Sequence, residues 1–162
     1  MMEEKEKAWK TVSSKYLFRR PWLTVRCEDM LLPNGNHIPE YYILEYPDWV
    51  NTIAITKDGK FVFVRQYRPG LGRTSYELCA GVCDKEDASP LVSAQRELWE
   101  ETGYGKGNWQ EYMVISANPS THTNLTHCFL ATDVEPIDHQ HLEDTEDLSV
   151  HLLTFEEVKQ LL

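Results

Sequence analysis

The sequence has no long hydrophobic run and no hydrophobic leader at its start. Its apolar stretches fall short of the roughly 18 consecutive residues that a membrane-spanning helix needs. The first residues, MMEEKEKAWK, lack the apolar segment and the small-residue cleavage site of a secretory signal. We therefore expect a cytoplasmic protein without a membrane segment.

Cysteine is scarce, with 4 residues in a chain of 162. Because no export signal is visible, we expect these cysteines to be reduced and buried rather than joined in two disulfides. Cys79 and Cys83 form a single C-x3-C pair with no second pair to match it. This argues against a structural zinc site.

Basic residues are outnumbered, with 16 Lys and Arg against 26 Asp and Glu and a net charge of −10. Nucleic-acid-binding surfaces need a basic patch or stripe, so we expect no nucleic-acid partner. An excess of negative charge instead suits a protein that binds divalent cations or their phosphate complexes. We expect the partner to be a small molecule.

The chain is long enough to form one hydrophobic core, and 41% of its residues are hydrophobic and 11% aromatic. We expect one domain over residues 1–162. Two β-rich hairpins are predicted around the turn signals PNGN at 33–36 and KDGK at 57–60. Residues 1–15 lack clear periodicity and are predicted to be a loose arm or a frayed helix.

A helix with good end signals is predicted between Ser89 and Gly103. Ser89 can act as the N-cap, and Pro90 suits the first helical position. Gly103 can supply the left-handed residue that ends the helix.

This helix carries Glu97, Glu100 and Glu101 within one and a half turns. Residues three and four apart share a helical face, so these like charges repel each other unless a cation offsets them. Three carboxylates beside a glycine loop form an oxygen-rich site that suits Mg²⁺ or Mn²⁺. The alternative is an ordinary solvated acidic face.

The segment GVCDKEDASPLVSAQRELWEETGY, residues 81–104, resembles the Nudix box, G-x5-E-x7-R-E-U-x-E-E-x-G-U with U a bulky apolar residue. The matching positions are Gly81, Arg96, Glu97, Leu98, Glu100, Glu101, Gly103 and Tyr104. The spacing from Gly81 to Arg96 is one residue longer than the pattern, so the first Glu of the box is either Glu86 or replaced by Asp87.

The resemblance implies an α/β fold, an α/β/α sandwich around a mixed β-sheet, preceded by an N-terminal antiparallel β-hairpin layer. That layer would span about residues 16–50 and the catalytic core about 51–162. The implied metal ligands of Mg²⁺ or Mn²⁺ are Glu97, Glu100, Glu101 and the carbonyl of Ala80. Glu100 and Glu101 would also be catalytic, while Gly81, Arg96 and Gly103 would be structural.

The segment FVFVRQYRPGLGRTSYELCAG resembles ADP-ribose and nucleoside-diphosphate-sugar pyrophosphatases, in which the arginine corresponding to Arg68 touches phosphate. Glu77 is a further candidate for a salt bridge or a metal contact. In those enzymes the N-terminal layer forms a homodimer and offers aromatic side chains to the base, here Trp22 and Tyr41 from two different strands. Cross-strand packing is the alternative role for this pair.

The segment ANPSTHTNLTHCFLATDVE resembles the strand and loop that line the substrate side in related Nudix hydrolases. The candidates there are Asn118, Asn124, His122 and His127.

Water attack on phosphorus needs a carboxylate as base, and in the resembled enzymes this carboxylate comes either from the box or from an acidic loop before the last strand. That loop is LEDTEDLSVHLL here, where Glu146 is the first choice, followed by Asp144 and Glu143. The alternative is an ordinary solvated loop.

The resemblance therefore predicts a Nudix hydrolase that cleaves the pyrophosphate of a nucleoside diphosphate linked to another moiety. ADP-ribose, giving AMP and ribose 5-phosphate, is the first candidate. The chain has no Lys or Arg between Arg26 and Lys57, where some ADP-ribose hydrolases place a second phosphate-binding arginine, so another nucleotide sugar stays open. The resemblance is also compatible with a nucleoside triphosphate pyrophosphohydrolase or with a non-catalytic nucleotide sensor.

Overall fold

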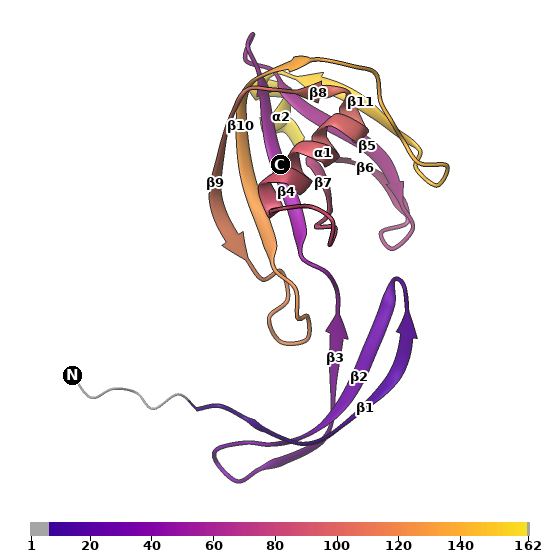
Figure 1. Ribbon diagram of the computed structural model, residues 1–162, viewed down its shortest axis with the longest axis vertical. Helices are drawn as coiled ribbons and strands as arrows, with labels where there is room; N and C mark the ends of the chain where they lie inside the picture. The colour runs from indigo at the N-terminus through magenta and orange to yellow at the C-terminus, as the bar shows by residue number, and fades with distance from the viewer. Residues whose placement is uncertain (1–6, 162) are drawn as a thin grey trace, which may run out of the picture. The chain divides into compact units, whose positions relative to one another are not determined.

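A computed structural model describes residues 7–161 of the chain. Two compact units are present. The first contains the chain up to Tyr46 together with Ser116–Asn124, and the second contains Pro47–Ile115 together with Leu125–Leu162. Each unit has its own β-sheet (Figure 1).

The first unit is built on a three-stranded antiparallel sheet of order β1-β2-β3. Its strands are β1 (Lys10–Arg20), β2 (Leu23–Leu31) and β3 (His37–Glu45). The predicted hairpin at 33–36 is confirmed as the β2–β3 connection, where Gly35 has φ +85°. A residue with a side chain rarely adopts that conformation.

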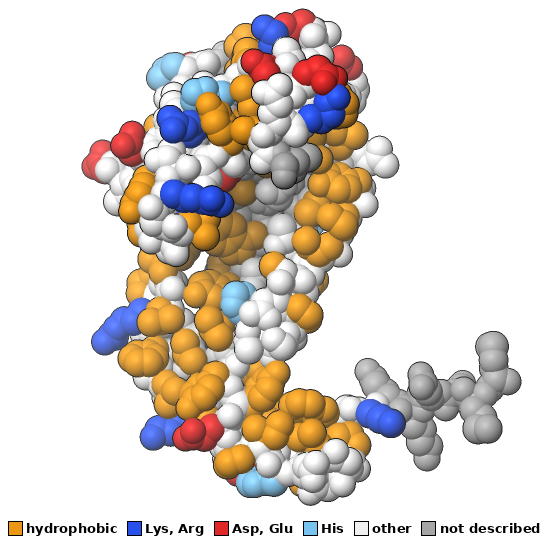
Figure 2. Space-filling model, turned by 180° about the vertical axis from the view of Figure 1, so that it is seen from behind, with side chains coloured by type: hydrophobic (Ala, Val, Ile, Leu, Met, Phe, Trp, Pro, Cys, Tyr) orange, Lys and Arg blue, Asp and Glu red, His pale blue; other side chains and the backbone are white. Residues whose placement is uncertain are grey.

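The prediction for residues 1–15 was wrong over 10–15, which belong to β1, while residues 1–6 lie outside the described part. Lys10 pairs with Leu31 and Lys15 with Cys27, so the strand is formed by pairing with β2. Figure 2 shows apolar side chains gathered on this unit. Val12 and Phe18 of β1 and Trp22 of the following turn are all exposed.

The second unit is built on a mixed eight-stranded sheet with the path β11-β5-β4-β10-β8. β6 pairs with β5, β7 with β4, and β9 with β10. The bounds are β4 Trp49–Thr56, β5 Phe61–Arg68, β6 Arg73–Glu77, β7 Cys79–Val82, β8 Tyr104–Gly105, β9 Asn108–Ile115, β10 Thr126–Pro136 and β11 Leu148–Leu153. The β4 and β10 strands are parallel and the other pairs are antiparallel, which makes the sheet mixed as predicted.

Two helices cover this sheet, α1 (Pro90–Thr102) and α2 (Phe155–Leu161). α1 packs against β4 and β7, and α2 packs against β11. In Figure 1, α2 is seen behind the strands that α1 overlies, as expected for helices on the two sides of a sheet. Leu98 and Ala94 of α1 are fully buried against the sheet, and this contact fixes the helix over β7.

All four cysteines lie in the described part of the chain and are unpaired, as expected. Cys79 and Cys128 are buried, and Cys27 and Cys83 are partly buried. Over residues 7–161, none of the helices has the length and apolar character needed to cross a bilayer.

Candidate active site

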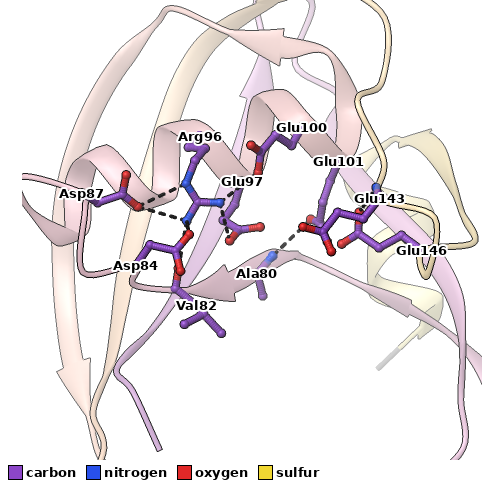
Figure 3. A network of polar contacts seen from close by, with 10 residues as sticks. All are labelled: Ala80, Val82, Asp84, Asp87, Arg96, Glu97, Glu100, Glu101, Glu143 and Glu146. Atoms are coloured by element: carbon purple, nitrogen blue, oxygen red, sulfur yellow. Dashed lines mark hydrogen bonds and ion pairs between the residues drawn. The ribbon is translucent and has the colours of Figure 1, made fainter. Parts of the chain in front are cut away.

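The ends of α1 are set by local chemistry, and they decide which way its carboxylates point. Ser89 accepts a hydrogen bond at Oγ from the backbone N–H of Val92, at 3.4 Å. Gly103 has φ 71° and donates its N–H to the carbonyl of Trp99 at 2.7 Å. Both predicted caps are confirmed. With the ends fixed, Glu97 and Glu101 face β7 (Figure 3).

Gly81 of β7 lies directly against the carboxylate of Glu97. A Cβ atom at this position would overlap all three atoms of the Glu97 carboxylate group. Only glycine therefore allows Glu97 to lie against the strand, where its side chain is 14% exposed. Burial raises the pKa of Glu97, and the neighbouring Arg96 charge partly offsets that rise.

Glu101 is the most deeply buried carboxylate of the cluster, with 5% of the residue exposed. The backbone N–H of Ala80 donates to its Oε2 at 3.3 Å. Burial, followed by the nearby charge of Glu97, raises the pKa of Glu101 to about 8. A divalent cation would stabilise the ionised form that burial disfavours.

Arg96 crosses the face of α1 and joins it to the loop that precedes the helix. Its Nη1 donates to Glu97 and to Glu100, each at 2.9 Å. Its Nη2 donates to the Val82 carbonyl and to Asp87, each at 3.0 Å. Burial lowers the pKa of Arg96, but hydrogen bonding to Asp87 and the glutamate charges outweigh it and raise the pKa overall.

These contacts decide between the two candidates for the first acidic position of the box. Asp87 is bound by Arg96 through both Nε and Nη2, at 3.2 and 3.0 Å, whereas Glu86 is exposed. Asp84 adds a further ion pair to Arg96 at 3.2 Å. Of the two candidates, Asp87 is therefore the one that contacts Arg96.

The acidic loop between β10 and β11 brings further carboxylates to the same face. Figure 3 shows Glu143 and Glu146 beside Glu101. The Glu143 N–H donates to the Glu146 carboxylate at 2.9 Å, and the Glu146 N–H donates to the Glu143 carbonyl at 3.0 Å. After burial and closer charges, the charge of Glu146 also raises the pKa of Glu97 and Glu101. Asp144 is exposed.

Two anchors of this loop could not be foreseen from the sequence. The Gln140 side chain donates from Nε2 to the carbonyl of Glu101 at 2.7 Å, and the His141 N–H donates to the carbonyl of Glu100 at 2.8 Å. They bind the last turn of α1 and so hold the loop beside the carboxylates. The sequence signal was only a polar stretch of no fixed period.

Arg68 lies at the end of β5 and is held by Glu77 of β6. Its Nε contacts both Glu77 carboxylate oxygens at 3.0 Å, and its Nη2 contacts Oε2 at 2.6 Å. This hydrogen bonding raises the pKa of Arg68 against the lowering effect of burial, and the charge of Glu101 adds to the rise. Arg68 is therefore a fixed cation near the carboxylate cluster.

The two candidate aromatic residues lie in different parts of the first unit. Trp22 is 71% exposed and sits in the β1–β2 turn, so its predicted place in a strand was wrong. The Tyr41 ring of β3 packs edge-on against the Trp9 ring, with the ring centroids 5.5 Å apart. The Tyr41 hydroxyl donates a hydrogen bond to the Ser120 carbonyl.

The strand register separates this pair. Tyr41 pairs with Glu28, whereas Trp22 lies just before Leu23 at the other end of β2. At about 3.4 Å per residue, the distance along the sheet is roughly 17–20 Å. One base cannot contact both side chains within a single chain.

The residues after β9 are divided between the two units. Asn118, His122 and Asn124 belong to the first. The Asn118 carbonyl accepts from the His122 N–H at 2.9 Å, which closes a turn. His127 of β10 belongs to the second unit, where Nδ1 lies 2.8 Å from Glu111 and Nε2 lies 3.5 Å from Asp48.

The carboxylate cluster fits a hard divalent cation on its chemistry. Glu101 is buried and Glu97 is partly buried, and both have raised pKa values. Glu100 and Glu146 lie beside them, and Arg96 is shared with Asp87. Such a set of oxygen donors with one shared cation is stabilised by Mg²⁺ or Mn²⁺.

Comparison with known proteins agrees with this geometry. The NUDIX domain profile matches residues 46–162, and the nucleoside diphosphate sugar hydrolase N-terminal domain profile matches residues 9–44. An ADP-ribose pyrophosphatase of Bacillus subtilis is 31% identical over 94% of this chain and 82% of its own. A methanol dehydrogenase activator of Bacillus methanolicus is 30% identical over 93% of this chain and 81% of its own. The crystal structure of an ADP compounds hydrolase superposes with a TM-score of 0.81 at 22% identity, over 94% of this chain and 82% of that one.

Proposed function

Because the chain belongs to the NUDIX family and is a Nudix hydrolase, we propose that it hydrolyses the pyrophosphate of a nucleoside diphosphate joined to a sugar. ADP-ribose is the first candidate, giving AMP and ribose 5-phosphate. The observation that carries the proposal is the group formed by the buried Glu101 and the partly buried Glu97, where Arg96 binds both Glu97 and Glu100. The match of residues 9–44 to a nucleoside diphosphate sugar hydrolase domain supports the substrate class.

In this proposal Glu97, Glu100, Glu101 and the Ala80 carbonyl hold Mg²⁺ or Mn²⁺. A bound divalent ion would supply positive charge to the diphosphate and would make water a better nucleophile. Arg96 keeps Glu97 and Glu100 in place through its two 2.9 Å contacts. Gly81 keeps the space that the Glu97 carboxylate needs.

The protein's own groups carry the remaining steps. Arg68 binds a phosphate oxygen, and Glu77 orients its guanidinium. Glu146 accepts a proton from the attacking water as the water oxygen bonds to phosphorus. The bond from phosphorus to the bridging oxygen then breaks, and that oxygen leaves on the second phosphate. Positioning and charge neutralisation supply most of the rate enhancement.

The first unit would serve the same reaction as a dimerisation layer. Val12, Phe18 and Trp22 are each more than half exposed on or beside its sheet, and a second chain that covered them would remove apolar surface from water. In such a homodimer, Trp22 and Tyr41 would contact the base from two different chains, since the register keeps them apart within one.

A second nucleotide sugar is the alternative substrate. It is favoured by the absence of Lys and Arg between Arg26 and Lys57, which leaves the β2–β3 region without a second phosphate-binding cation. The roles of Asn118 and Asn124 in binding substrate would differ between the two, because a polar amide can bind a sugar hydroxyl as well as a phosphate oxygen.

The experiment is a substrate panel analysed by anion-exchange chromatography. ADP-ribose, ADP-glucose, UDP-glucose, GDP-mannose, NADH, diadenosine polyphosphates and dNTPs are each incubated with the protein and Mg²⁺, Mn²⁺ or EDTA. Metal-dependent cleavage that favours one nucleotide sugar supports the proposal, and ¹⁸O-labelled water then identifies the attacked phosphorus. Binding of ADP-ribose without turnover of any compound would contradict hydrolysis and favour a sensor.

A further inference from the structure

A second group of metal-binding side chains lies outside the carboxylate cluster. Within residues 7–161, Asp138, His139 and His141 place one donor atom each within 4.8 Å of the others. Asp138 Oδ1 lies 2.7 Å from His139 Nδ1, and Asp138 Oδ2 lies 3.0 Å from His141 Nε2. The three residues therefore bring their donor atoms close together, which the D-H-x-H spacing alone does not require.

The backbone of this segment is held in place by α1. The N–H groups of Ile137 and Asp138 both donate to the carbonyl of Gly103, at 2.9 and 3.1 Å. The His141 ring lies over Trp99 with the centroids 4.2 Å apart, and the two histidine rings are 4.4 Å apart. A site whose ligands are held before binding loses less conformational entropy when the ion enters.

The electrostatic surroundings favour a cation at this point. The segment packs on the C-terminal end of α1, whose dipole is negative there, and the last turn of that helix has no basic side chain to complement it. The segment 138–147 also carries five Asp and Glu residues and no Lys or Arg. A bound divalent ion would supply the missing positive charge.

The donor set distinguishes this group from a magnesium site. Mg²⁺ prefers oxygen ligands in an octahedron, whereas two imidazoles with one carboxylate suit Zn²⁺ and similar transition metals. Tetrahedral ligands at 2.0–2.2 Å from an ion lie roughly 3.4 Å apart, so the donors would move by less than about 1 Å. One coordination position would remain for water.

We propose that Asp138, His139 and His141 form a binding site for a zinc-class divalent transition metal, separate from the carboxylate cluster. The ion would hold together the start of the loop that leads to Glu143 and Glu146, where the loop packs on the end of α1. The site does not depend on the proposed hydrolysis, because its ligands belong to a different set of residues.

Calorimetry with Zn²⁺ tests the site on the full-length chain, free of any affinity tag and in a large excess of Mg²⁺. The variants are His139→Asn and His141→Asn, and the matched control is His37→Asn, which removes an imidazole that pairs with Asp29, away from the cluster. The His139 side chain is 80% exposed, so its substitution leaves the fold intact even if that of His141 does not. No substrate is present, so failure of the proposed hydrolysis would not affect the result.

The expected result is saturable binding of one ion that each variant weakens at least about tenfold and the control leaves unchanged. Co²⁺ provides a second readout, because an ion at the cluster would quench the Trp99 that lies against His141, and Trp99→Phe would lose that quenching. The proposal is overturned if binding is absent, if His139→Asn binds as tightly as the parent, or if the control loses as much affinity.

Discussion

Substitution of Arg96 by glutamine is expected to destabilise the metal-free protein strongly. Arg96 gives Glu97, Glu100 and Asp87 their nearest positive charge, through contacts of 2.9 to 3.0 Å. Breaking a buried ion pair from one side costs about 3–5 kcal/mol, because the other charge stays buried without a partner. Since the Arg96 side chain is 24% exposed, we lower the expected loss to about 2–4 kcal/mol.

The assay is urea unfolding followed by circular dichroism and tryptophan fluorescence, in EDTA and in Mg²⁺. Lys159→Gln is the control, because Lys159 pairs with Glu156 on the surface of α2 and its loss should cost at most about 1 kcal/mol. Mg²⁺ should recover part of the stability lost with Arg96, since it supplies positive charge to the same carboxylates. A loss no larger than that of the control, or one that Mg²⁺ leaves unchanged, would refute the reasoning.

Three further results are expected. Gly81→Ala should displace the Glu97 carboxylate and weaken Mn²⁺ binding by about tenfold or more, as measured by electron paramagnetic resonance. Unchanged affinity would show that Glu97 does not need the space beside Gly81. The affinity for Mn²⁺, measured by calorimetry, should rise with pH by at most about tenfold per pH unit and should level off above the Glu101 pKa of about 8. The reason is that the ion competes with a proton for this carboxylate. An affinity that does not change with pH would contradict the assignment of Glu101 as a ligand. Arg68→Lys should raise KM or lower kcat in steady-state assays by about tenfold or more, because lysine lacks the planar guanidinium that Glu77 orients. Kinetics like those of the parent would show that Arg68 does not bind phosphate.

The helix and its acidic face could be predicted because their signals are local. Ser89 and Gly103 fix the ends through bonds within one turn, and the helical period then puts Glu97 and Glu101 on one side. The turn at 33–36 was predictable for the same reason, since Gly35 sits where φ is positive.

The features that could not be predicted depend on contacts between distant residues. β1 forms because Lys10 and Lys15 pair with β2, although its own sequence has no clear period. The choice of Asp87 over Glu86 depends on where the longer loop turns toward Arg96. Gln140 reaches the carbonyl of Glu101 across 39 positions of sequence, and no spacing rule connects the two.

The central claim is that the carboxylates of α1 form a metal-dependent hydrolytic site, and Glu101→Gln tests it most directly. The rate of hydrolysis of the best panel substrate is measured for the parent, for this variant and for Glu156→Gln, an exposed glutamate of α2, with Mg²⁺, Mn²⁺ or EDTA. The account predicts that the parent needs the metal, that Glu101→Gln loses at least about 100-fold in kcat, and that Glu156→Gln matches the parent. A Glu101→Gln variant with the parent's rate and the parent's metal dependence would contradict it.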